Sequence, residues 1–186
     1  MTKRLFIALN LPADIKSELA KLVNILKAGS VGVSWCHQDN IHLTLHFLGN
    51  IKQEKIEQIK SVMQSLAGRW GRLEFALGGL SAFPNLAHPR VIFIGLKQIN
   101  GQSVYELQEL LGEKLNNIKF ATDQRPWKPH LTLGRVKTDF SQSAVRINTA
   151  NFTITTKQFF VATFELMESR SKLSGTEYYK IMSYKL

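Results

Sequence analysis

The feature that most constrains the fold is a tetrapeptide that occurs twice, H-L-T-L, at residues 42–45 and again at residues 130–133. The chain has only five histidines in 186 residues, so two identical tetrapeptides that begin with one are hard to attribute to chance. Internal self-similarity of this kind predicts that two parts of a chain share one structural plan. We therefore expect two similar halves, each presenting one copy of the motif.

The hydrophobic patterns around the motifs predict strands and amphipathic helices in alternation. We expect helices at residues 13–27, 53–68 and 101–118, strands at residues 3–9, 33–35, 41–49, 72–83, 90–96 and 130–136, and two or three more strands between residues 152 and 186. This order predicts an α+β fold of two lobes, each with a mostly antiparallel sheet and covering helices, related by an approximate two-fold axis. A single larger sheet is the alternative.

Alternation along a strand divides the motif's side chains between two faces. His42 and Thr44 share one face, and the two leucines of the motif share the other; His130 and Thr132 repeat this in the second copy. The leucines are expected to anchor each strand on a core, while the polar pair faces a cleft. Side by side, the two strands would present two imidazoles and two hydroxyls to one cleft, with no carboxylate from either motif.

This set of groups suits acid–base chemistry at a phosphodiester. An imidazole titrates near neutrality, so one ring can take a proton from an attacking water while the other gives a proton to a leaving oxygen. The threonine hydroxyls can donate hydrogen bonds to the non-bridging oxygens as negative charge gathers on them. The motifs therefore indicate in-line displacement at phosphorus without a metal ion. The alternative, that H-L-T-L is merely a strand-favouring tetrapeptide, is weakened by its recurrence.

Composition limits the compartment and the partners. The net charge of +10 favours anionic partners such as nucleic acid, although a basic surface with no special partner fits equally well. The single cysteine, Cys36, excludes an intramolecular disulfide and a multi-cysteine zinc site, and favours a reduced, cytoplasmic compartment. The apolar stretch from Leu5 to Leu9 is too short for a secretory signal, and no stretch is long enough to span a membrane.

Beyond the two motifs, the sequence resembles the 2H phosphoesterase superfamily, which is named for its paired H-x-[ST]-x motifs. It is similar in particular to the RNA 2′,3′-cyclic phosphodiesterases, also called LigT or 2′-5′ RNA ligases. The similarity covers nearly the whole chain: "RLFIALNLP", "HLTLHFLG", "FPNLAHPRVIFIGL", "RPWKPHLTLGR" and "FELMESRSKLSGTEYY". It implies one two-lobed LigT-like domain over residues 1–186, with the active-site cleft between the lobes.

The resemblance also implies a reaction. A terminal 2′,3′-cyclic phosphate, on RNA or on a nucleoside, is opened to a 2′-phosphomonoester, so the 3′ oxygen leaves. His42 is then the proton donor to that oxygen and His130 the proton acceptor that activates water, although the residue types alone allow the reverse. Thr44 and Thr132 hold the phosphate, no cofactor or metal is needed, and the same site run backwards could act as a ligase. We expect a monomer.

Four further residues invite interpretation. Similar family members carry an arginine at the position of Arg135, which suggests a substrate contact, but strict alternation places it opposite His130 unless a bulge intervenes; a structural ion pair is the alternative. Phe83, beside the loop "PNLAHP", could stack on a base or belong to the core. His46 is expected at the cleft rim or surface, because a strand separates it from His42 by roughly 13 Å, too far for one metal ion. Trp127 is expected to pack rather than stack.

Two other functions compete with the phosphodiesterase. One is a non-catalytic module on the same fold that binds nucleotides or RNA ends, but binding alone has no need of two proton-transfer groups. The other is a metal-dependent hydrolase, which would lose its activity in chelator.

Overall fold

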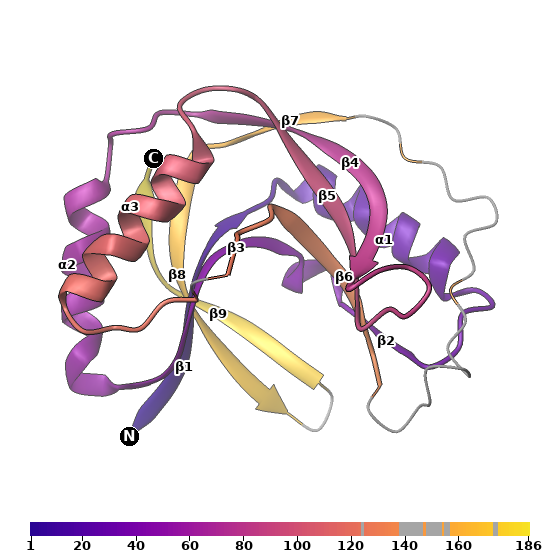
Figure 1. The fold of residues 1–186 in the computed structure, drawn as a ribbon, viewed down its shortest axis with the longest axis horizontal. Helices are drawn as coiled ribbons and strands as arrows, with labels where there is room; N and C mark the ends of the chain where they lie inside the picture. The colour runs from indigo at the N-terminus through magenta and orange to yellow at the C-terminus, as the bar shows by residue number, and fades with distance from the viewer. Residues whose placement is uncertain (124, 138–146, 148–153, 155–156, 173–174) are drawn as a thin grey trace.

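Strands and helices follow one another largely as expected in the computed structural model, which describes residues 1–123, 125–137, 147, 154, 157–172 and 175–186 (Figure 1). The helices are α1 (Ala13–Lys27), α2 (Ile56–Leu66) and α3 (Val104–Asn117). The strands are β1 (Thr2–Asn10), β2 (Val33–Trp35), β3 (His42–Lys52), β4 (Leu73–Phe83), β5 (Val91–Asn100), β6 (His130–Val136), β7 (Gln158–Val161), β8 (Thr163–Lys172) and β9 (Gly175–Lys185). The strand expected to begin at residue 152 falls partly outside the described residues.

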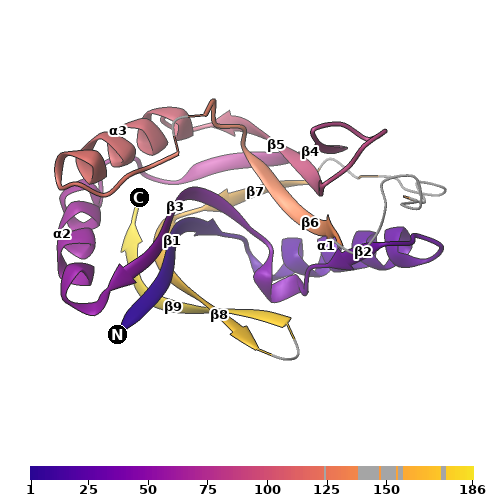
Figure 2. The ribbon, with the colours of Figure 1, turned by 60° about the horizontal axis from the view of Figure 1, so that its bottom comes forward.

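The strands form one antiparallel sheet made of two halves (Figures 1 and 2). Its order is β7-β4-β5-β6-β3-β1-β8-β9, and β2 pairs with β6. The halves meet where β3 pairs with β6 at Leu43 and Leu131, one residue from each motif. The α+β class and the antiparallel halves are thus confirmed. The halves are joined edge to edge into a single larger sheet, which was the alternative to two separate sheets. Because an antiparallel pair has a local two-fold axis, the motifs meet in the symmetric way that the repeat predicts.

The helices pack on one face of this sheet. In Figures 1 and 2, α2 and α3 lie side by side at one end and α1 lies at the other. All three contribute to the same core as the strands of both halves. The four motif leucines belong to that core and are at most 2% exposed: Leu43, Leu45, Leu131 and Leu133. The expected anchoring is therefore confirmed, and the polar side chains of the motifs are left on the opposite face.

Each motif strand contains an irregularity at the same position of the repeat. On β3, Thr44 pairs with Ala8 and His46 with Ile7, so Leu45 is the extra residue of a bulge. The irregularity between β5 and β6 likewise leaves Leu133 between two paired residues. Both extra residues are the fourth letter of H-L-T-L. A bulge interrupts alternation, so the residues that follow each motif change face.

None of the helices in the described part of the chain is long and apolar enough to cross a membrane.

Candidate active site

The polar side chains of the two motifs lie on the face of the sheet opposite the core. Continuing the Leu43–Leu131 register by one residue on either side brings His42 beside Thr132 and Thr44 beside His130. Directly opposed residues have Cβ atoms about 4.5–5.5 Å apart, and diagonal ones, such as the two histidines, are roughly 7–8 Å apart. A phosphate group hydrogen-bonded on two sides can bridge that separation.

Both imidazoles are fixed in the same way. The Nδ1 atom of His42 lies 2.8 Å from the carbonyl oxygen of Asn40, and Nδ1 of His130 lies 2.6 Å from that of Lys128. A carbonyl only accepts, so each Nδ1 carries a proton and donates it to the backbone two residues earlier. Each Nε2 is then the atom that exchanges protons. On His42 it lies 2.9 Å from Oγ1 of Thr44.

Aromatic rings enclose His42. Phe6 of β1 stacks on the imidazole with ring centroids 4.8 Å apart and an interplanar angle of 27°. Tyr178 of β9 meets it edge-on, 5.2 Å away at 80°. These contacts orient the ring and remove water from around it.

His130 has a similar enclosure in the other half. Phe83 lies edge-on to it at 5.0 Å, and Phe93 at 5.2 Å. Phe83 itself stacks on Phe93 with centroids 4.3 Å apart and is only partly buried. The structure therefore places Phe83 at the wall of the site and not deep in the core.

Burial changes the proton affinity of both rings. It lowers the pKa of His42 to about 4, and the charges of Lys16, His130 and Arg135 act in the same direction, while the bond to the Asn40 carbonyl opposes them. Burial also lowers the pKa of His130, helped by the charge of Arg135. Both imidazoles are therefore neutral at pH 7 in the free protein. A bound phosphate anion would favour the protonated form and raise both pKa values.

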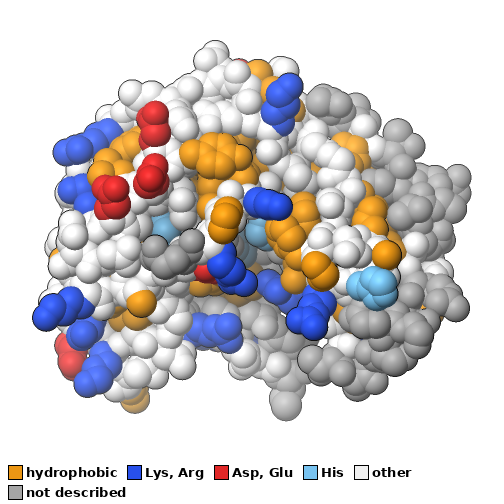
Figure 3. All heavy atoms as spheres, viewed as in Figure 1, with side chains coloured by type: hydrophobic (Ala, Val, Ile, Leu, Met, Phe, Trp, Pro, Cys, Tyr) orange, Lys and Arg blue, Asp and Glu red, His pale blue; other side chains and the backbone are white. Residues whose placement is uncertain are grey.

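A pocket of about 470 Å³ opens beside the motifs. It is lined by Thr44, Leu45, His46, Phe47, Phe83, Val91, Gln108, Asp123, Arg125, Pro126, Trp127, Lys128, His130 and Arg135. On the face drawn in Figure 3, a histidine surface is recessed near the middle, with basic and hydrophobic side chains around it. A positively charged, partly apolar pocket of this kind suits a phosphate that carries a sugar and a base.

The bulge at Leu133 explains how Arg135 reaches the pocket, although strict alternation would place it on the face opposite His130. Past the bulge, Arg135 is exposed and lines the same pocket as His130. No acidic side chain in the described part of the chain forms an ion pair with it, so the structural alternative gains no support. Phe47 lies five residues after the first histidine, as Arg135 does after the second, and it also lines the pocket.

His46 lines the pocket, but the expectation that it lies at the cleft rim or surface was wrong, because the side chain is buried. It is 4% exposed, and its Nε2 lies 2.7 Å from the carbonyl oxygen of Gln108 in α3. The bulge at Leu45 turns its side chain away from the face of His42 and against α3. Gly112 makes room there, since a Cβ atom at that position would lie 2.9 Å from the imidazole.

Sequence reasoning missed the aromatic residues that enclose the histidines, Phe6, Tyr178 and Phe93, which come from strands remote in sequence. It also missed Phe47. The equal spacing of Phe47 and Arg135 from the two histidines was a signal that could have found it.

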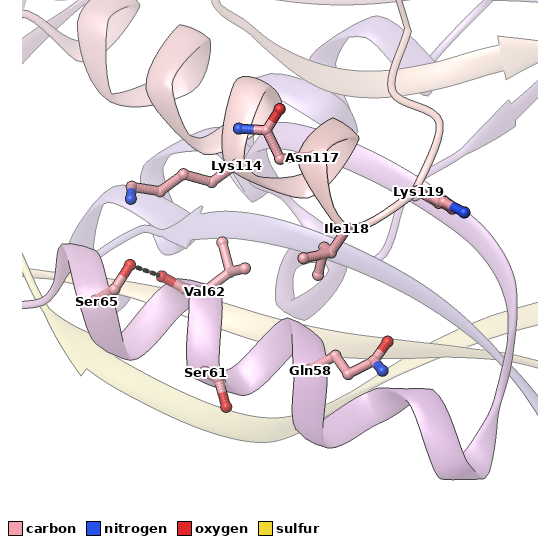
Figure 4. A pocket seen from close by; sticks show the side chains of 8 residues that line it. All are labelled: Gln58, Ser61, Val62, Ser65, Lys114, Asn117, Ile118 and Lys119. Atoms are coloured by element: carbon pink, nitrogen blue, oxygen red, sulfur yellow. Dashed lines mark hydrogen bonds between the residues drawn. The ribbon is translucent and has the colours of Figure 1, made fainter.

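A second and larger cavity, about 680 Å³, lies between α2 and α3 (Figure 4). It is lined by Gln58, Ser61, Val62, Ser65, Lys114, Asn117, Ile118 and Lys119. It includes no motif residue and no histidine, so it offers no imidazole for proton transfer. Within the described ranges, no cluster of three or more His, Cys, Asp or Glu side chains is placed to hold a metal ion.

Comparison with known proteins shows the family of the chain. The family model described as LigT like Phosphoesterase matches residues 9–93, which include the first motif. Two curated relatives are named RNA 2′,3′-cyclic phosphodiesterase. The one from Methanocaldococcus jannaschii is 35% identical over 134 residues, 72% of this chain and 72% of that protein. The one from Archaeoglobus fulgidus is 34% identical over 134 residues, 72% and 73% of the two chains.

Solved structures share the fold over almost the whole chain. The Thermus thermophilus protein TT0787 superposes with a TM-score of 0.82 at 25% identity, covering 98% of this chain and 97% of that one. E. coli LigT complexed with 3′-AMP superposes with a TM-score of 0.78 at 22% identity, covering 100% and 99%. The LigT-like architecture expected from the sequence is confirmed. From these relatives and the family model, the chain belongs to the LigT-like phosphoesterase family.

Proposed function

We propose that this protein opens terminal 2′,3′-cyclic phosphates, on RNA ends or on nucleosides, to 2′-phosphomonoesters. The observation that carries the proposal is the symmetric pair of histidines, each with Nδ1 bound to a backbone carbonyl and Nε2 available for proton transfer. The names of the curated relatives support this substrate class.

In the proposed mechanism, the phosphate binds between the two motif strands. Water attacks phosphorus, and Nε2 of His130 accepts the proton that the water loses. The bond from phosphorus to the 3′ oxygen breaks, and Nε2 of His42 donates a proton to that oxygen. Thr44 and Thr132 donate hydrogen bonds to the non-bridging oxygens. Proton exchange with solvent then returns His130 to its neutral form, and His42 takes up a proton again when the next phosphate anion binds and raises its pKa.

Arg135 and Phe83 complete the proposed substrate site. A guanidinium matches a phosphate with two parallel hydrogen bonds, and Arg135 lines the pocket with His130. The partly exposed ring of Phe83 gives the sugar or base an apolar wall. If a 5′-hydroxyl takes the place of water, its oxygen attacks phosphorus, His130 accepts its proton and the 3′ oxygen leaves as before, which joins two RNA ends by a 2′-5′ phosphodiester; this ligation is reversible.

We further propose that residues 1–186 act as one unit, as a monomer in the cytoplasm. Both motifs belong to one chain and line one face of its sheet, so the site needs no second copy. The single cysteine supports a reducing compartment.

The direct test is an RNA oligonucleotide with a 2′,3′-cyclic phosphate end, incubated with the protein in excess EDTA. We expect turnover that EDTA does not abolish and a product that carries a 2′-phosphate, identified by chromatography against 2′- and 3′-phosphate standards. Tight binding without any product would favour the non-catalytic module. Activity lost in EDTA and restored by a divalent cation would favour a metal-dependent hydrolase. A product with a 3′-phosphate would show that the 2′ oxygen leaves and not the 3′ oxygen.

The lowered pKa values predict an unusual pH dependence. Catalysis needs one histidine neutral and the other protonated, so the rate peaks between their two pKa values. The profile of kcat/KM reports the free protein, in which burial lowers both pKa values below 6.5, to about 4 for His42, so its maximum is expected below pH 6.5. The profile of kcat reports the complex, in which the phosphate anion raises both pKa values, so its maximum is expected at higher pH. Steady-state kinetics from pH 4 to 9 would measure both; a kcat/KM maximum above pH 7 would contradict the assignment.

A further inference from the structure

Little of the backbone pairing joins the two motif strands. β1 pairs with β3 along its whole length, from Thr2 to Asn10, and β5 pairs with β6 from Val91 to Gly95. By contrast, the register between β3 and β6 consists of the pair Leu43–Leu131. The spacing of the two histidines therefore depends on additional contacts between the halves.

Trp127 supplies one such contact. Its indole Nε1–H donates a hydrogen bond of 3.0 Å to the carbonyl oxygen of Thr44, in the middle of the first motif. The two residues are 83 positions apart in the sequence, and the bond is partly buried. Thr44 immediately precedes the bulge residue Leu45, so the bond holds β3 at the point where its pairing with β1 is irregular.

The next residue in the chain, Lys128, contacts the second motif. The carbonyl oxygen of Lys128 accepts the hydrogen bond from Nδ1 of His130, at 2.6 Å. Two consecutive residues therefore contact different motifs. Trp127 binds the backbone of Thr44, and Lys128 binds the imidazole of His130. The indole is itself held from α3, where Tyr105 meets it edge-on with ring centroids 5.4 Å apart.

Building on the proposed function, we infer that Trp127 is a positioning residue: its indole N–H ties the segment that orients His130 to the backbone of Thr44, and so sets the separation of the two histidines. The tryptophan makes no proton transfer of its own. Loss of the bond would let the first motif shift relative to the second. A displacement of about 1 Å in a reacting group can lower a rate by about a hundredfold.

The replacement Trp127→Phe tests this, because it keeps an aromatic ring and removes the N–H donor. We expect kcat to fall by about ten- to a hundredfold, with KM little changed, because the phenylalanine ring keeps the apolar surface that Trp127 gives to the pocket. The chain offers a matched control in Trp70, whose Nε1–H donates to the carbonyl oxygen of Ser103 at 3.1 Å, also in a partly buried setting. Trp70 does not line the motif pocket, so Trp70→Phe should keep the wild-type kcat while losing a comparable hydrogen bond.

Each outcome decides the matter. A kcat for Trp127→Phe equal to that of Trp70→Phe would show that the indole only packs, and a raised KM at unchanged kcat would make it a substrate contact; both overturn the inference. If Trp127→Phe does not fold, benzothienylalanine at position 127 replaces N–H by sulfur at nearly constant shape, and the same fall in kcat is expected. A wild-type protein without turnover would overturn the proposed function itself, whereas an active wild type with a fully active variant would overturn the inference alone.

Discussion

Replacement of His130 by asparagine is expected to lower kcat by about 10²–10⁴-fold, the usual contribution of a general acid or base. Asparagine is chosen because its amide can keep a hydrogen bond to the carbonyl of Lys128, so that the loss reports the missing proton acceptor. His42→Asn should lose a similar amount for the same reason, with its amide facing the carbonyl of Asn40. The two residues act in one step, so the double variant should lose far less than the product of the two single losses.

Two histidines outside the motifs provide the controls. His37 and His88 are exposed and do not line the motif pocket, so His37→Asn and His88→Asn should keep the wild-type kcat. Circular dichroism and thermal unfolding of all variants would establish that the fold survives. A near-normal kcat in either His42→Asn or His130→Asn, with the fold intact, would remove that residue from the mechanism.

Much of this site was predictable because its signals are local. The alternation of H-L-T-L was enough to assign the leucines to the core, and the helical spacing of residues 13–27 gave the bounds of α1 as the structure has them. The recurrence of the motif predicted two related halves. A repeated polar pattern carries information about geometry, because identical strands paired antiparallel present identical faces to one cleft.

The parts that could not be predicted depend on non-local contacts. Whether a bulge forms at the last residue of each motif is decided by pairing with β1 and β5, which the motif itself does not encode, and the bulge decides where His46 and Arg135 point. The low pKa of His42 likewise depends on burial beneath Phe6 and Tyr178, from strands at opposite ends of the chain. The sequence was compatible with two separate sheets and with one larger sheet. The two arrangements differ by a single residue pair, Leu43 with Leu131, which joins the halves.

Because the bulge turns Arg135 into the pocket, replacing this arginine should weaken binding of the transition state. Arg135→Gln is expected to lower kcat/KM by about ten- to a hundredfold, the usual cost of losing a hydrogen bond to a charged group. Arg135→Lys should recover only part of that loss, since an ammonium keeps the charge but not the two parallel donors. Steady-state kinetics on a nucleoside 2′,3′-cyclic phosphate would measure all three proteins.

Arg125 gives the sharpest comparison for Arg135, because both line the same pocket. The guanidinium of Arg125 is already bound to both carboxylate oxygens of Asp123, which also hold its pKa above the ordinary value. It therefore has less capacity left for a phosphate, and Arg125→Gln should change kcat/KM much less than Arg135→Gln. Equal losses in the two variants would mean that the pocket attracts phosphate by its summed charge, and that the direction imposed on Arg135 by the bulge at Leu133 has no part in catalysis.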